Sequence, residues 1–187
     1  KNNKIDLRYS TNLSTLSYKS YDIRDYWKNW NGNIEAGLSI DGIDERFDYI
    51  RYGVHWNTVK KNIQEILKLK NIIVWVSITT GLYNVLYLKE TIVELTNIGI
   101  PINKISLNPA MGELSVHNAP DKLKEDALII FKKLKQTPSL MPRKMSVIEQ
   151  LCKQDPDTND FTKKLKEIDY RRKTNYLNTF PILQKYI

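Results

Sequence analysis

Residues 72–78 read IIVWVSI, an unbroken run of apolar and β-branched residues, and this run decides the fold class of the chain. Such residues favour β-strands, and a strand without polar alternation is typical of a sheet covered by helices on at least one face. Helical spacing flanks the run on both sides, with Val59 and Ile63 before it and Leu88 and Ile92 after it. The stretch therefore predicts a strand between two amphipathic helices.

The same alternation extends outward in both directions. Further strands are predicted at residues 4–10, at 34–40 (IEAGLSI) and at 102–107 (INKISL), and an amphipathic segment follows each of them. Strands separated by single helices pair in parallel through right-handed crossovers. Four strands are few for a closed barrel, so two interpretations stand: a small open α/β domain, or a partial (β/α) barrel whose other strands precede this chain.

The pattern changes in the last third of the chain. A linker with two prolines at 137–143 precedes helices predicted near 145–153 and 161–177. The sequence therefore predicts an α/β part over residues 1–136 and a helical extension over residues 137–187.

Composition narrows the class of protein. The 187 residues are 41% hydrophobic and 27% charged, which is an ordinary globular balance. The sequence contains no apolar run long enough to cross a membrane, and its first four residues lack the apolar core of a signal peptide. A single cysteine, Cys152, excludes an internal disulfide and an all-cysteine metal site, and two histidines are too few for a histidine-rich one. We expect a cytoplasmic protein with no membrane partner and no metal ligands of its own.

Polar residues stand where the predicted strands end. Asn12 follows the first strand, Ser39 and Asp41 the second, Asn84 the third and Asn108 the fourth. Because the carboxyl ends of parallel strands meet at one edge of the sheet, ligands of α/β proteins bind there. These side chains are therefore candidates for one binding site.

A longer motif surrounds Ser39. Residues 37–42 (GLSIDG) are followed by an acidic turn and by residues 51–56 (RYGVHW). This arrangement resembles the fourth-strand region of radical S-adenosylmethionine (SAM) enzymes of the SPASM/twitch subgroup, which includes twitch-type members found in phages. Residues 7–12 (LRYSTN) are similar to the preceding strand of that family, and residues 170–181 look like its short C-terminal segment.

The resemblance implies the C-terminal part of a (β/α)6 barrel with SAM across its top. In that family a [4Fe–4S] cluster, held by a C-x-x-x-C-x-x-C motif, cleaves SAM to a 5′-deoxyadenosyl radical. This sequence lacks the motif and the cysteines of an auxiliary cluster. The resemblance therefore implies a fragment that is not competent alone, with cluster ligands supplied by a missing N-terminal region or by a partner chain.

The resemblance also assigns a role to Ser39 and Arg51, which match the positions that hold the SAM carboxylate. A guanidinium group binds a carboxylate through two hydrogen bonds, and a hydroxyl adds a directed donor. The plainer interpretation is a serine at a strand end and an arginine on the surface.

The remaining candidates are assigned in the same way. Asn12 matches a residue near the amino-acid end or ribose of SAM. Asn84 and Asn108 are expected to contact the ribose and adenine, because both follow strand ends. Asp41 shapes the turn after its strand and faces the substrate, and Gly42 is expected to take a positive φ. The alternative for the three asparagines is an ordinary turn cap or loop amide.

The charge distribution supports a different class of function. The net charge is +8, and residues 120–187 hold 15 basic and 9 acidic side chains, an excess of +6. A basic segment of this kind binds nucleic acid electrostatically, or is simply a solvated face. The alternative to the radical SAM hypothesis is thus a non-catalytic basic α/β module that binds nucleic acid or, through an open sheet edge, another protein chain. Neither hypothesis names a substrate.

Overall fold

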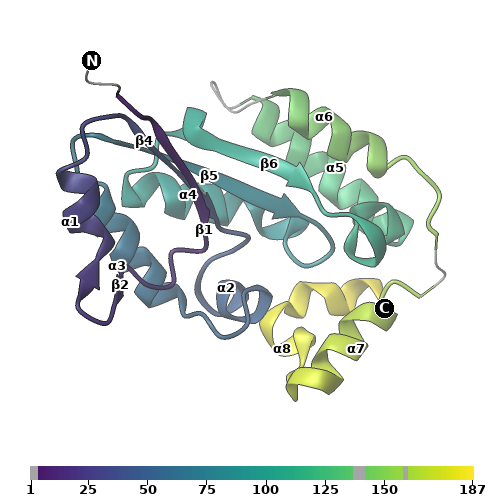
Figure 1. The fold of residues 1–187 in the computed structure, drawn as a ribbon. Coiled ribbons are helices and arrows are strands. Elements are labelled where there is room, and N and C mark those ends of the chain that lie inside the picture. The colour runs from purple at the N-terminus through teal and green to yellow at the C-terminus, as the bar shows by residue number, and fades with distance from the viewer. Residues whose placement is uncertain (1–3, 137–141, 158–159) are drawn as a thin grey trace.

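The computed structural model describes residues 4–136, 142–157 and 160–187. Its main sheet contains the strands β1 (Leu7–Thr11), β4 (Ile34–Ser39), β5 (Ile72–Thr80) and β6 (Ile105–Pro109). All neighbouring strands pair in parallel, in the spatial order β1-β4-β5-β6 (Figure 1). The predicted α/β class and the parallel sheet are confirmed.

Helices connect the strands and continue beyond them. They are α1 (Ile23–Lys28), α2 (Asp44–Ile50), α3 (Trp56–Ile66), α4 (Leu88–Ile98), α5 (Asp121–Lys135), α6 (Pro142–Leu151), α7 (Lys163–Arg172) and α8 (Tyr176–Thr179). A short antiparallel pair, β2 (Ser17–Tyr18) and β3 (Tyr21–Asp22), precedes α1. Asp22 caps α1 by accepting a 2.9 Å hydrogen bond from the backbone N–H of Arg24. Gly99 ends α4 with a φ of 112°, a conformation that glycine adopts without strain.

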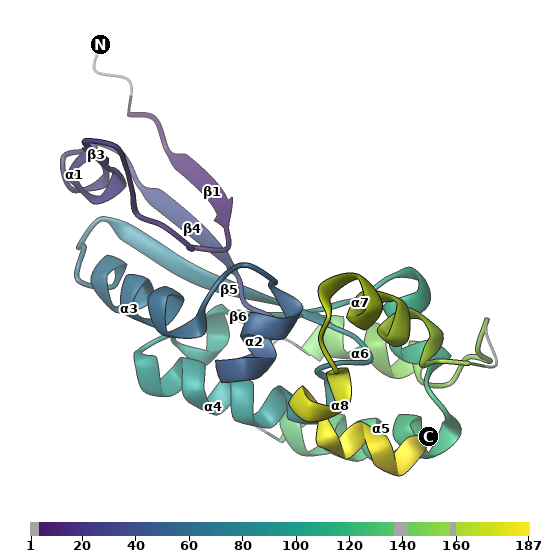
Figure 2. The ribbon, with the colours of Figure 1, turned by 90° about the horizontal axis from the view of Figure 1, so that it is seen from below.

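One face of the sheet is covered by helices and the other is largely open. Along β5 the side chains of Val74, Val76 and Ile78 are buried, whereas those of Ile73 and Thr79 are exposed. Successive side chains of a strand point to opposite faces, so burial on alternate residues marks a single covered face. Figure 2 shows α3 and α4 together on that side of the sheet.

The C-terminal helices join the same hydrophobic core as the sheet. Helix α6 packs against β6 and α5, and α8 contacts α2. The rings of Tyr49, Tyr83 and Phe180 contact one another, with centroid distances of 5.3 Å from Phe180 to each tyrosine and 5.4 Å between the tyrosines. The first residues of the predicted linker, 137–141, lie outside the described residues. Within the described ranges, every helix is too short or too polar to cross a membrane.

Several local predictions were wrong. The fourth strand begins at Ile105, because the segment after Pro101 forms a 3-10 turn at Ile102–Lys104. The acidic turn is the helix α2, since it packs Phe47 into the core. Gly42 does not adopt a positive φ.

The long C-terminal helix is also interrupted. It ends at Arg172 because Lys173 takes a left-handed conformation with a φ of 54°. A second short helix, α8, then starts under an Asn175 cap, whose side chain accepts a hydrogen bond from Leu177 N–H. The predicted helix over 161–177 is therefore two elements with a turn between them.

Candidate ligand site at the carboxyl ends of the strands

The turns that follow β4, β5 and β6 enclose a small pocket of about 140 Å³. Its walls come from the strand ends, from α2 and from α7, so segments far apart in the chain meet here. The lining residues are Asp41, Ile50, Thr79, Gly81, Leu82, Tyr83, Asn84, Ala110, Leu114, Ile168 and Arg172. The position is the one at which α/β proteins bind ligands.

Asp41 is the centre of this site. One carboxylate oxygen accepts a 2.6 Å hydrogen bond from the backbone N–H of Thr79, and the other forms a 2.6 Å ion pair with Arg51. The Asp41 side chain is almost fully buried, whereas that of Arg51 is about one third exposed. The Nε atom of Arg51 is buried and has no hydrogen-bond partner among the described residues. Asp41 thus lines the pocket, whereas Arg51 is not among the lining residues and is joined to the site through this ion pair.

Asn84 connects the turns after β4 and β5. Its amide nitrogen donates to the carbonyl oxygens of Asp41 (2.7 Å) and Thr79 (2.8 Å), and its amide oxygen accepts from the N–H of Gly81 (2.9 Å). Both amide N–H groups are therefore used within the chain. In this geometry Asn84 holds the site together and has no donor left for a ligand.

Ser39 and Asn108 lie on the open face of the sheet, beside this pocket. Ser39 is paired in register with Ser77 on β5, and Ser77 is paired with Ser106 on β6. The amide nitrogen of Asn108 donates to the hydroxyl of Ser77 at 2.5 Å. A row of hydroxyl and amide groups therefore crosses three strands.

Asn12 follows β1 at the end of this row. Thr11 is paired with Leu38, so Asn12 stands beside Ser39 on the neighbouring strand. Its side-chain oxygen accepts a 3.1 Å hydrogen bond from the N–H of Ser14, which is an Asx turn. Asp41 thus contacts both Arg51 and Asn84, and the other three predicted residues lie along the adjoining strand ends.

The sequence interpretation assigned no role to two polar residues of the pocket wall, Tyr83 and Arg172. Arg172 of α7 donates a 2.7 Å hydrogen bond to the carbonyl of Tyr49 and lies over the ring of Tyr52, 4.9 Å from its centroid. Tyr83 follows β5, and burial raises the pKa of its hydroxyl to about 12. The sequence signals for Arg172 were its place in the basic C-terminal segment and within residues 170–181. Neither predicts its approach to the site, because that approach depends on tertiary packing.

Asp169 attaches α7 over the site. One carboxylate oxygen accepts from the hydroxyl of Tyr49 (2.6 Å), and the other accepts from the backbone N–H of Tyr176 (2.7 Å). Burial, together with this hydrogen bond, raises the pKa of Tyr49 above its ordinary value. Tyr49 therefore stays a neutral donor throughout the physiological pH range.

A serine, a histidine and an aspartate form a second chain of hydrogen bonds elsewhere. The ring nitrogens of His117 lie 2.9 Å from the hydroxyl of Ser115 and 2.7 Å from a carboxylate oxygen of Asp157. Ser115 is buried, with 1% of its surface exposed, so a substrate has no access to its hydroxyl. The cluster fastens the segment before α5 to the segment after α6, and it does not have the geometry of a nucleophilic site.

The described residues contain no group of three or more metal-ligating side chains. Cys152 is buried on the C-terminal side of α6, and burial raises the pKa of its thiol to about 11. Because the thiolate is the metal ligand and the nucleophile, Cys152 is a poor candidate for either role.

Many basic side chains of the C-terminal third are already paired. Lys135 pairs with Glu149, Lys185 with Asp126, and Lys164 with both Glu113 and Glu167. Exposed pairs of this kind contribute little to stability, but they reduce the net positive field of the surface. Binding of nucleic acid by this region stays a prediction.

Comparison of the chain with protein-family models, with curated proteins and with solved structures finds no match.

Proposed function

We propose that this chain is the SAM-binding part of a radical SAM enzyme, and that its sheet is one section of a larger (β/α) barrel. The observation that carries the proposal is the Asp41–Arg51 ion pair beside the buried, unpartnered Nε of Arg51. The methionine end of SAM carries an ammonium group next to a carboxylate. A site with a carboxylate and a guanidinium group side by side is complementary to that pair of charges.

Each residue then has a definite task. Arg51 has donors beyond the one that Asp41 accepts, and these bind the SAM carboxylate. Asp41 accepts from the ammonium group, and Ser39 adds a hydroxyl at the end of β4, the strand that Asp41 follows. The row that ends in Asn108 supports the ribose and adenine, while Asn84 orders the turns. These are binding and positioning tasks.

The iron–sulfur cluster does not fit this chain alone. The only thiol belongs to Cys152, whose raised pKa and burial oppose cluster ligation. The proposal therefore requires that a further polypeptide segment or a partner chain bring the C-x-x-x-C-x-x-C motif. When bound, the cluster supplies the electron that cleaves SAM.

Ligand binding to the chain itself is the first test. We expect saturation-transfer NMR to detect weak binding of S-adenosylhomocysteine, and Arg51→Met to remove the signal. Arg171→Met is the matched control, because Arg171 is exposed and pairs with Glu167 on the same helix. Equal signals from both variants would exclude Arg51 from the site.

The second test adds the missing motif. The chain is co-expressed with the polypeptide encoded nearest to it that carries C-x-x-x-C-x-x-C, and the complex is reconstituted anaerobically with iron and sulfide. We expect tighter SAM binding and release of 5′-deoxyadenosine on reduction. A reconstituted complex that neither binds nor cleaves SAM contradicts the proposal.

A further inference from the structure

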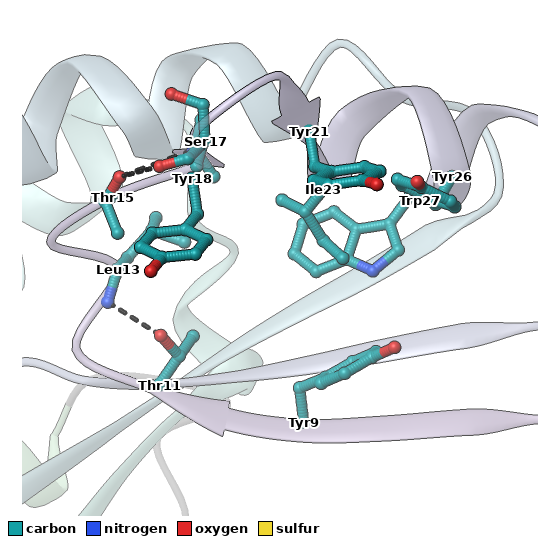
Figure 3. A pocket seen from close by; sticks show the side chains of 11 residues that line it. Tyr9, Thr11, Leu13, Thr15, Ser17, Tyr18, Tyr21, Ile23, Tyr26 and Trp27 are labelled. Atoms are coloured by element: carbon teal, nitrogen blue, oxygen red, sulfur yellow. Dashed lines mark hydrogen bonds between the residues drawn. The ribbon is translucent and has the colours of Figure 1, made fainter.

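A second, larger pocket lies at the opposite end of the strand order, beside β1. Its volume is about 330 Å³, and β1, the β2–β3 hairpin and α1 form its walls (Figure 3). The lining residues are Tyr9, Thr11, Leu13, Thr15, Leu16, Ser17, Tyr18, Tyr21, Ile23, Tyr26 and Trp27. The set contains five aromatic residues and no charged one, so the pocket suits an uncharged, apolar occupant.

The rim and the floor of this aromatic pocket differ. At the rim, Tyr18, Tyr21 and Tyr26 are 72%, 61% and 55% exposed, which is unusual for three neighbouring tyrosines. On the inner wall, Trp27 packs at 5.6 Å from the ring of Tyr9. The indole N–H of Trp27 is buried and has no hydrogen-bond partner among the described residues. A buried donor without an acceptor is costly, so this wall carries a desolvation penalty.

Among the described residues, no strand pairs with the edge of β1 beside the pocket. The backbone N–H of Leu7 donates to the carbonyl of Asn33 at 2.9 Å, at the start of the pairing with β4. In a parallel ladder alternate residues bond to the same neighbour, so the peptide groups of Arg8 and Ser10 point away from β4. Within the described ranges β1 is the terminal strand of the sheet. A row of peptide donors and acceptors is thus open to a further strand.

These two features have one geometric consequence. Tyr9 and Thr11 point from β1 toward the pocket, and they lie on the face of the sheet that the helices cover. A strand added along β1 would place every second side chain on this same face. An extended segment could therefore satisfy the free peptide groups and fill the aromatic pocket at the same time.

We propose that an extended polypeptide segment adds to the edge of β1 and inserts a bulky apolar side chain into the aromatic pocket. The segment belongs to another polypeptide, and its chemistry follows from the edge and the pocket: an extended backbone that carries one bulky apolar side chain. Main-chain hydrogen bonds give such strand addition its affinity, and the pocket gives it specificity. A phosphate ligand does not suit a lining without cations, and a small apolar molecule leaves the peptide groups of Arg8 and Ser10 unpaired.

The test uses a synthetic peptide and the full chain. The peptide alternates threonine with valine and has one central phenylalanine. Its twin carries N-methyl groups on alternate residues, which removes the donors of one edge. We expect fluorescence titration to show binding of the first peptide and at least about tenfold weaker binding of the twin. Equal affinities, or no binding of either peptide, would overturn the proposal.

Variants of the chain separate the edge from the pocket. Ser10→Pro removes the N–H at the free edge and leaves the bonds to β4 in place, whereas Ser10→Ala keeps the N–H. We expect Ser10→Pro, and Tyr18→Ala at the pocket rim, to weaken peptide binding about tenfold, and Ser10→Ala to bind as the unaltered chain does. Circular dichroism checks that each variant is folded.

Sedimentation identifies the other candidate occupant. If the chain forms a dimer that Ser10→Pro dissociates but that the peptide leaves intact, a second copy of the chain occupies the edge. That result would overturn the proposal. Peptide binding is measured without SAM, so its outcome is separate from that of the reconstituted complex. Strand addition in a complex that fails to bind SAM would refute the proposed function alone.

Discussion

Replacing Asn84 with alanine tests whether this residue holds the site together. The side chain is 3% exposed and makes three hydrogen bonds, to the N–H of Gly81 and to the carbonyl oxygens of Asp41 and Thr79. Asn84→Ala removes all three bonds and leaves their backbone partners without this amide. The turns after β4 and β5 then lose their direct connection through a side chain.

The expected loss of stability is large. A buried hydrogen bond contributes about 1 kcal/mol, and a buried group left unsatisfied costs about 1–3 kcal/mol, so we expect a loss of about 3–4 kcal/mol in the free energy of unfolding. For a chain of this length, that corresponds to a Tm lower by about 6–16 °C. Urea unfolding followed by circular dichroism measures the first quantity, and a thermal scan measures the second.

Asn103→Ala is the control, because Asn103 is exposed and lies away from the site. We expect its free energy of unfolding to stay within about 0.5 kcal/mol of the unaltered chain. If Asn84→Ala is as stable as the control, Asn84 does not order the turns. In that case Asn84 would be better explained as a residue that only contacts a ligand.

Three other measurements probe the rest of the molecule. We expect the thiol of Cys152 to react slowly with a disulfide reagent at pH 8 in the native chain and rapidly in denaturant, because its pKa is raised to about 11. Gly37→Ala places a methyl group against the ring of Trp75, and the overpacking should cost about 1–3 kcal/mol in urea unfolding. Hydrogen bonds from Arg24 lower the pKa of Asp22 to about 2, so its contribution to stability is present above about pH 4 and is lost as the pH falls toward 2. An acid titration of Asp22→Asn should be flatter in that window.

Most of the fold was predictable because strands and helices in this chain differ in hydrophobic period. The run at 72–78 lies within β5, and the spacing of Val59 and Ile63 marks α3. The errors occurred where tertiary contacts decide. Residues 44–50 begin with acidic side chains, so the segment looks like a turn in the sequence. It is a helix in the structure, because Phe47 packs into the core and is fully buried.

The site was predictable only in part. Position at the strand ends identified Asp41 and Asn84, because the parallel sheet brings those ends together whatever the loops do. The position of Asn84 in the sequence did not show that both N–H donors of its side-chain amide are used within the chain. Nor did position at the strand ends indicate Arg172, which approaches the pocket from a distant segment through Tyr49. Side-chain partners in loops depend on packing that a linear pattern does not contain.

The Asp41–Arg51 pair also limits which ligands the site can accept. A simple anion that takes Arg51 leaves the buried carboxylate of Asp41 with only the Thr79 N–H, and a simple cation that takes Asp41 leaves Arg51 without its partner. Removing one partner of a buried or half-buried ion pair is costly. A ligand that presents an ammonium group beside a carboxylate compensates both residues at once. We therefore expect the pair to favour the amino-acid end of a zwitterion over either charge alone, and competition of glycine against acetate or methylammonium at this site would test that preference directly.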